Sequence, residues 1–204
     1  MGNLAELCII GCGGHARSVA DVAVKNEPGL RCIFFDDNAE EGEVIMGFPA
    51  WKLDRLVLSG GRHCIIAVGD NESRERLYQR FLEMNVVSVI SKNAYTGTGS
   101  IIGRGCFVGD MAHIGPEADI GEDCIINTGA VVEHECVIGS HAHISVGAKV
   151  CGRSRIGRRT MVGAGATVID KISICDDVII GAGAVVVSDI MEKGTYVGVP
   201  AKKI

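Results

Sequence analysis

Residues 132–137, with the sequence VEHECV, hold the side chains best suited to acid–base chemistry. His134 stands there between Glu133 and Glu135. An imidazole titrates near neutral pH, and a carboxylate beside it can fix its tautomer and raise its basicity. We therefore predict that His134 is a general base. Glu135 is the adjacent candidate for the orienting acid. Glu133 is the alternative, because neighbouring side chains of a strand point to opposite faces.

This segment belongs to a long repeat with a period of six residues. Every sixth residue from Ile102 to Val186 is Ile or Val, and the residue four positions later is nearly always small. A hexapeptide period is the signature of a parallel β-helix, in which each repeat supplies one short strand and one turn. Three repeats complete a coil of about 18 residues, so the pattern predicts a triangular prism of about five coils.

Glycine has a regular place in this repeat. It often follows the aliphatic residue, as at Gly103 and Gly121, where we expect it to take backbone angles that other residues resist. Prisms of this type are left-handed, an exception to the usual right-handed crossover. Glu133 occupies one of these glycine positions. A charge-dense segment that breaks the rule of a regular array indicates a functional site, the alternative being a solvated turn without a role.

The coil length also predicts which residues stack along the prism. Gly152 lies one coil beyond His134, so its backbone amide is placed to face an oxyanion that forms near the imidazole. Val146, Ala164 and Ala182 form another column, with small or modest side chains. We expect an extended cofactor arm to be able to lie along that column.

A glycine-rich loop with the sequence GCGGHA at residues 11–16 follows a predicted strand and precedes a predicted helix. Asp36 ends the next predicted strand, where an acid can meet a ribose hydroxyl, and this spacing is typical of a dinucleotide-binding fingerprint. Only one mononucleotide-binding half fits before the prism. We therefore predict a nucleotide-sugar site rather than an NAD site, with a bare turn as the alternative. Other candidates near the strand ends are His15, Asp37, Gly69 and Asn71.

The predicted order of elements is that of a small parallel sheet with helices on its faces. We predict strands at residues 7–10, 32–35, 64–68 and 86–90, helices at 16–25 and 72–84, a short helix at 53–58, and a last strand at 195–199. The predicted fold class is therefore α/β plus all-β. A Rossmann-like βαβ domain over residues 1–92 precedes a left-handed parallel β-helix over residues 93–204.

Composition excludes several other classes of protein. The net charge of −5 does not favour nucleic-acid binding. We expect no membrane segment and no signal peptide, because the sequence has no long apolar run and no basic, apolar start. The nine cysteines form no CxxC pair, which indicates a reduced, cytoplasmic protein. The histidines lack the spacing of a β-prism metal site, so we predict no metal.

Several motifs together resemble those of the PglD/NeuD-type sugar acetyltransferases. They are GGH at 13–15, DD at 36–37, AVGDNE at 67–72, EHECVIG at 133–139, HISVGAK at 143–149 and VGVPAK at 197–202. The resemblance covers nearly the whole chain. It is strongest to the UDP-4-amino-sugar N-acetyltransferases of bacterial bacillosamine synthesis.

This resemblance implies a homotrimer that binds acetyl-CoA between neighbouring prisms. It implies His134 as the base, Glu135 as the acid that tunes it, and His143 as a second active-site histidine near acetyl-CoA. Ala164 and Ala182 match positions that contact acetyl-CoA. The positions that match nucleotide-sugar contacts are Gly13, Gly14, His15, Asp36, Asp37 and Gly69.

The expected reaction is transfer of acetyl from acetyl-CoA to the C4 amine of a UDP-4-amino-4,6-dideoxy-N-acetyl-hexosamine, which forms UDP-N,N'-diacetylbacillosamine. Two alternatives stay open. One is an O-acetyltransferase that acts on a sialic-acid-like sugar. The other is a β-helix without activity that only binds a nucleotide sugar or holds partners, which leaves the charged segment around His134 unexplained.

Overall fold

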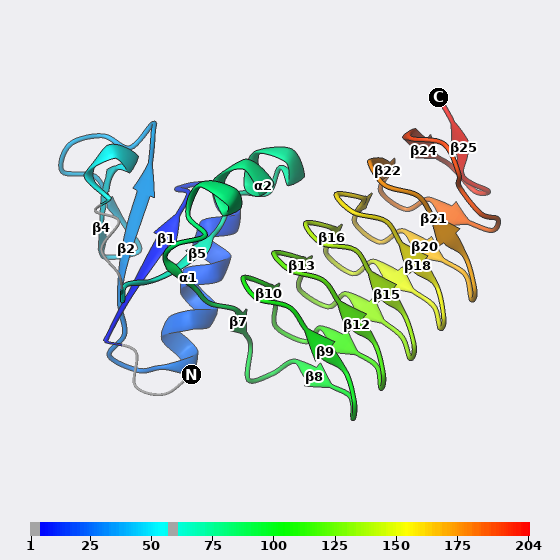
Figure 1. Cartoon of the computed structure of the whole chain (residues 1–204), viewed down its shortest axis with the longest axis horizontal. Coiled ribbons are helices and arrows are strands. Elements are labelled where there is room, and N and C mark those ends of the chain that lie inside the picture. The colour runs from blue at the N-terminus through cyan, green and yellow to red at the C-terminus, as the bar shows by residue number, and fades with distance from the viewer. Residues whose placement is uncertain (1–4, 57–60) are drawn as a thin grey trace.

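An α/β unit and a three-sided prism stand side by side in the computed structural model, which describes residues 5–56 and 61–204 (Figure 1). The elements of the α/β unit are β1 (Glu6–Ile10), α1 (Gly14–Asn26), β2 (Arg31–Asp36), β3 (Val44–Ile45), β4 (Phe48–Lys52), a 3₁₀ turn (Leu53–Arg55), β5 (His63–Ile66), α2 (Asn71–Arg80) and β6 (Asn85–Val86). Its sheet has the order β3-β4-β2-β1-β5-β6, and every pairing except β3–β4 is parallel. The predicted parallel sheet is confirmed.

The prism has three parallel faces, each built from short strands. The first face contains β7 (Val89–Ile90), β10 (Phe107–Val108), β13 (Ile125–Ile126), β16 (His143–Ile144), β19 (Met161–Val162), β22 (Val178–Ile180), β24 (Gly194–Val197) and the antiparallel β25 (Lys202–Lys203). The second contains β8 (Tyr95–Thr96), β11 (His113–Ile114), β14 (Val131–Val132), β17 (Lys149–Val150), β20 (Thr167–Val168) and β23 (Val185–Val186). The third contains β9 (Ile101–Ile102), β12 (Asp119–Ile120), β15 (Val137–Ile138), β18 (Arg155–Ile156) and β21 (Ser173–Ile174).

The predicted aliphatic column forms the core of the prism. Ile114, Val132 and Val150 have no exposed surface, and the small residues Ala130 and Ala148 are equally buried. Equivalent residues of adjacent coils pair directly, as when β14 aligns with β11 on one side and β17 on the other. A strand of two residues has little stability alone, so the stacked coils supply the stability of the array.

The predicted reason for the repeated glycines is wrong. Gly103 and Gly121 do not have a positive φ. Instead, a Cβ at Gly121 would lie 2.6 Å from the backbone nitrogen of Ser140 in the next coil. Glycine is therefore needed for the close approach of adjacent coils. The left-handed backbone angle occurs two residues later, where side chains are tolerated, as at Asp123 and Glu135.

The strand predicted at 86–90 is divided between the two units. Val86 pairs with Cys64 in the α/β sheet, whereas Val89 pairs with Phe107 in the first face of the prism. Strand pairing in the prism thus begins at residue 89, and the domain boundary at 92/93 stays a prediction. Phe107 also shares a hydrophobic cluster with Val19 of α1, so this helix covers the early coils of the first face.

The loop region between residues 37 and 62 differs most from the prediction. The sequence shows no clear strand there, but β3 and β4 form a hairpin whose second strand extends the sheet beside β2. The short helix predicted at 53–58 is a 3₁₀ turn over Leu53–Arg55. Leu56 follows this turn with an extended backbone, and residues 57 and 58 of the predicted helix lie outside the described residues. Within the described part of the chain, neither α-helix is long and apolar enough to span a bilayer.

Candidate functional site

The imidazole of His134 stands at the corner between the second and third faces of the prism. Its Nδ1 lies 2.9 Å from Oε2 of Glu135, and about half of each side chain is exposed. Glu135 has a φ of 57°, so the backbone bends there and brings its side chain to the same side as the ring. This turn explains how consecutive residues can interact, which an extended strand would not allow. The geometry favours Glu135 over Glu133 as the partner of His134.

Gly152 lies directly beside this imidazole, as the coil length predicts. A Cβ at Gly152 would be 2.6 Å from Nε2 of His134 and 3.1 Å from Oδ1 of Asp170. Only glycine leaves room for the ring in this position. The carbonyl of Gly152 accepts a hydrogen bond from the amide of Lys171. The oxyanion contact of its own amide stays a prediction.

His143 is on β16, in the first face, and lies next to His15 at the start of α1. The two ring centroids are 6.4 Å apart, and His15 also packs edge-on against Phe107. Nδ1 of His143 and Nε2 of His15 are both buried without a hydrogen-bond partner in the structure. Two histidines predicted to contact different ligands therefore meet where the α/β unit joins the prism. Their free nitrogens can bind polar atoms of a ligand.

Both of these histidines are neutral at physiological pH. Burial lowers the pKa of His143 to about 4 and that of His15 to about 3. The positive charge of Arg74 contributes to both lowered pKa values, and for His15 the neighbouring His143 contributes more than Arg74 does. These two side chains can therefore donate or accept a hydrogen bond but do not carry charge into the site.

The low pKa values predict that acid destabilises the fold. In the unfolded chain, His143 has an ordinary pKa near 6.5 and binds a proton below that pH. In the folded protein it binds the proton only near pH 4. Its stabilising contribution is thus complete above pH 6.5 and is lost as the pH falls toward 4. We expect the free energy of unfolding to fall by about 2 kcal/mol for His143 alone between pH 7 and pH 5. Urea unfolding at a series of pH values measures this change.

A His143→Asn variant is the control, because it should lose part of the pH dependence without gaining a charge. Titration of the ring protons by NMR gives a direct check. If the His15 and His143 rings titrate near 6.5 in the folded protein, burial does not lower their pKa values and the predicted loss of stability in acid is wrong.

Two of the nucleotide-sugar candidates, Asp36 and Asp37, line a crevice at the carboxyl ends of the strands, whereas Gly69 lines a separate cavity of about 400 Å³ between α2 and the prism. The crevice has a volume of about 260 Å³ and is also lined by Gly11 and Val68, among others. Gly11 has a φ of 123°, and a Cβ there would lie 2.7 Å from the carbonyl oxygen of Ala67, so only glycine suits the turn. The crevice is at the position where open α/β sheets bind ligands.

Asp36 holds the glycine-rich loop in place. Its Oδ2 accepts a hydrogen bond from the amide of Cys12 at 3.0 Å, and its Oδ1 accepts one from the amide of Asn38 at 2.8 Å. Gly13 is the N-cap residue of α1 and makes no side-chain hydrogen bond, and Gly14 is the first residue of the helix. The space where a Cβ of either residue would stand is open. The first amides of α1 are therefore free to bind an anion.

Arg17 was missed in the sequence analysis. Its guanidinium donates hydrogen bonds to the carbonyls of Cys12 and Gly13 and thus lies at the mouth of the loop. The available signal was a basic residue in the first turn of the helix that follows a glycine-rich loop. A cation there favours a phosphate group at the same place.

The residues predicted for catalysis and acetyl-CoA binding fall into two groups that one chain does not bring together. His134, Glu135 and Gly152 stand at the corner between the second and third faces. His143 is on the first face, and Ala164 and Ala182 are exposed at the corner that follows it. His134 and His143 are separated by half a coil and therefore lie on opposite sides of the prism. Among the described residues, no three His, Cys, Asp or Glu side chains form a metal-binding group.

Comparisons with known proteins agree with this division into two units. The PglD N-terminal domain family matches residues 6–81, and the bacterial transferase hexapeptide family matches residues 99–134 and 153–188. The acetyltransferase domain of PglB from Neisseria gonorrhoeae is 30% identical over 98% of this chain and 100% of that one, with a TM-score of 0.92. The chain belongs to the PglD-type hexapeptide-repeat sugar acetyltransferases.

Other relatives extend the comparison. The same PglB domain has been solved in complex with acetyl coenzyme A. A histidine mutant of perosamine N-acetyltransferase from Caulobacter crescentus, in complex with CoA and GDP-perosamine, is 29% identical over 98% of this chain and 97% of that one, with a TM-score of 0.86. An uncharacterized protein of Acanthamoeba polyphaga mimivirus is 33% identical over 109 residues, and this chain spans only 21% of it.

Membership of the PglD-type family confirms the predicted fold class. The prism is the left-handed parallel β-helix of hexapeptide-repeat transferases, and the α/β unit before it is the PglD N-terminal domain. The protein is therefore an acetyl-CoA-dependent sugar acetyltransferase.

Proposed function

We propose that this protein acetylates the C4 amine of a UDP-linked 4-amino-4,6-dideoxy-N-acetyl-hexosamine with acetyl-CoA as donor, the reaction that forms UDP-N,N'-diacetylbacillosamine. The main support is the exposed His134 imidazole, which Glu135 orients and Gly152 accommodates. Relatives crystallised with acetyl coenzyme A, or with CoA and GDP-perosamine, support the donor and the class of acceptor. All nine cysteines are free, which supports a reducing cytoplasm as the compartment.

In the proposed mechanism, His134 acts through Nε2. Since Nδ1 interacts with Glu135, Nε2 is the nitrogen free to accept a proton. The amine must lose a proton as it becomes an amide, and His134 accepts it. Glu135 then stabilises the imidazolium. The amine nitrogen bonds to the thioester carbonyl carbon of acetyl-CoA and the carbon–sulfur bond breaks. CoA leaves as a thiol when the imidazolium of His134 returns its proton to the sulfur.

The side chains around the proposed site suit both acetyl-CoA and the nucleotide sugar. His143 and His15 each present a buried, unpartnered ring nitrogen where the two units meet. Ala164 and Ala182 leave an exposed strip without bulky side chains on the adjacent corner. A thioester carbonyl or sugar hydroxyl suits the free nitrogens, and an extended pantetheine arm suits the strip. These residues are compatible with both ligands.

The proposed site is completed by a second copy of the chain. His134 and His143 cannot meet within one prism, because they face opposite sides of it. In a closed trimer, the His134 corner of one copy can face the His143 side of its neighbour. We therefore propose a homotrimer with one site at each interface.

A substrate panel tests this function. The full chain is incubated with acetyl-CoA and UDP-linked 4-amino sugars of gluco and galacto configuration, GDP-perosamine, or nine-carbon sialic-acid-like sugars, and released thiol is measured. We expect the UDP-4-amino sugars to have the highest kcat/KM. Faster reaction of a sialic-acid-like sugar would favour the O-acetyltransferase. Thiol release with none of them would exclude the proposed reaction.

The contact between Gly152 and His134 predicts a sensitive position. A Gly152→Ala substitution places a methyl group where the imidazole now lies and must displace the ring. Because a shift of about 1 Å in a catalytic group can lower the rate about 100-fold, we expect a loss of this size in kcat. Steady-state kinetics measures it. Gly42→Asn is the control, since residue 42 has a positive φ that Asn tolerates, open space for a side chain and a position away from the prism. Equal kcat in Gly152→Ala and wild type would contradict the contact.

A further inference from the structure

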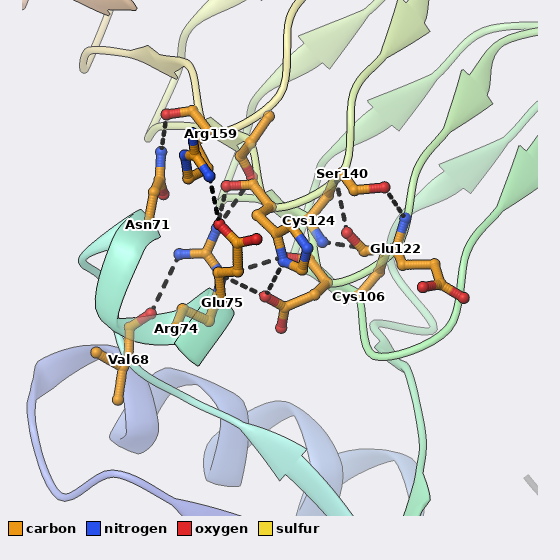
Figure 2. A network of polar contacts seen from close by, with 12 residues as sticks. Val68, Asn71, Arg74, Glu75, Cys106, Glu122, Cys124, Ser140 and Arg159 are labelled. Carbon is orange, nitrogen blue, oxygen red and sulfur yellow. Dashed lines mark hydrogen bonds and ion pairs between the residues drawn. The ribbon is translucent and has the colours of Figure 1, made fainter. Parts of the chain in front are cut away.

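A buried arginine links α2 to the prism in the polar network of Figure 2. Arg74 is only 1% exposed. Its Nε donates to the carbonyl of Asp123 at 3.0 Å and lies 3.3 Å from Oδ2 of the same residue. Its Nη2 donates to the carbonyl of His141 at 2.6 Å. Asp123 and His141 are one coil apart, so the guanidinium spans two coils of the prism.

The same guanidinium also holds the turn before α2. Its Nη1 donates to the carbonyls of Val68 at 3.2 Å and Gly69 at 3.4 Å. Val68 lines the crevice of the α/β sheet. On the prism side, His141 is two residues from His143. The carbonyl of Gly69 partly offsets the lowering of the His143 pKa that burial causes, although it does not form a well-aligned hydrogen bond. Arg74 therefore joins the wall of the crevice to the neighbourhood of His143.

The energetics of this network argue against a purely stabilising role. Burial lowers the pKa of Arg74 and raises that of Asp123, so both charged forms lose solvation. A buried ion pair is weak evidence for stability, because apolar side chains of similar size often replace it without loss. A guanidinium can, however, fix several acceptors in one plane, which the single ammonium of lysine cannot do. Position 74 therefore requires arginine because of the number and direction of the hydrogen bonds that the guanidinium makes.

We infer that Arg74 is a positioning residue that sets the Val68–Gly69 turn, and with it the bound nucleotide sugar, at a defined distance from His143. The inference rests on the proposed function for the identity of the ligand. The guanidinium contacts protein carbonyls and a carboxylate only. It acts on the reaction through the turn and through the coil that carries His143.

Other contacts of α2 with the prism provide a matched control. Glu75 pairs with Arg159 at 2.7 Å and also with Arg158. Asn71 donates to the carbonyl of Arg159 at 2.8 Å. The Glu75 contacts fasten the same helix to the same prism but do not contact the turn at Val68. A Glu75→Gln variant thus weakens the attachment of α2 to the prism. It leaves the contacts of Arg74 with the Val68–Gly69 turn in place.

The kinetic test compares Arg74→Lys, Glu75→Gln and wild type. We expect Arg74→Lys to lower kcat/KM for the nucleotide sugar by about 10-fold or more while KM for acetyl-CoA stays within about twofold. Glu75→Gln should remain within about twofold of wild type for both substrates. Equal effects of the two variants would show that Arg74 only fastens the helix and would overturn the inference. So would wild-type kinetics in Arg74→Lys.

A second measurement does not depend on activity. Amide hydrogen exchange of the full chain is followed in a peptide that covers residues 67–72. We expect faster exchange there in Arg74→Lys than in Glu75→Gln or wild type, because the turn carbonyls lose their donor. Exchange at the wild-type rate would overturn the inference. If wild type acetylates no nucleotide sugar, the proposed function fails, but the exchange result still decides the role of Arg74 at the turn.

Asp123→Asn is a second variant that tests the same network if Arg74→Lys does not fold. Asn tolerates the left-handed backbone of residue 123, where φ is 54°. The change removes the carboxylate charge beside Arg74 and keeps the backbone carbonyl that Nε contacts. We expect faster exchange at residues 67–72 than in wild type, but slower than in Arg74→Lys. Unchanged exchange in both Asp123→Asn and Arg74→Lys would contradict the role of the network.

Discussion

Replacing His134 with alanine is expected to lower kcat by about 10²–10⁴-fold, the usual contribution of a general base. The side chain is partly exposed, and its ring pairs with the carboxylate of Glu135. Its removal should therefore leave the core of the prism and the assembly unchanged. Steady-state kinetics measures kcat, and size-exclusion chromatography with light scattering measures the assembly.

Two further variants separate the roles in this pair. Glu135→Gln keeps the size of the side chain but not the charge that raises the basicity of the imidazole, so we expect a smaller loss than in His134→Ala and an altered pH–rate profile. His63→Ala removes an imidazole from the α/β sheet and should keep kcat near wild type. A His134→Ala protein with wild-type kcat would contradict the proposed mechanism.

The prism was predictable from the sequence because its geometry is periodic. Once six residues make one side and three sides make one coil, the position of every residue follows by counting. The stacking of Gly152 beside His134 was obtained in this way, and the structure confirms their proximity. The interaction of His134 with Glu135 rather than Glu133 was not predictable in the same way, because it depends on the left-handed backbone of Glu135.

Contacts between the two units could not be predicted by counting. The spacing of Arg74 from the buried Tyr78 places it on the inward face of α2, but its partners lie 49 and 67 positions away and no local pattern indicates them. The proximity of His15 and His143 likewise depends on how α1 covers the first face. The β3–β4 hairpin was missed because its short strands gain stability from β2 rather than from their own pattern.

The placement of His134 and His143 on opposite sides of one prism leads to a second large effect. If both act in the same reaction, they must come from different chains. His134→Ala and His143→Ala should each be nearly inactive alone, because every site of the proposed homotrimer then lacks one of the two groups. A mixed trimer differs, since one interface can combine the intact His134 of one copy with the intact His143 of its neighbour.

The size of this rescue follows from the assembly. If the two variants are unfolded together and refolded at equal amounts, about a quarter of the interfaces in random trimers carry both histidines. We expect about that fraction of wild-type kcat, measured per site. Mixing the folded variants without exchange of subunits is the control and should give no recovery. Because a site within one chain could never be repaired by a neighbour, an inactive refolded mixture that still forms trimers would contradict the shared site, whereas recovery would assign the two histidines to different copies.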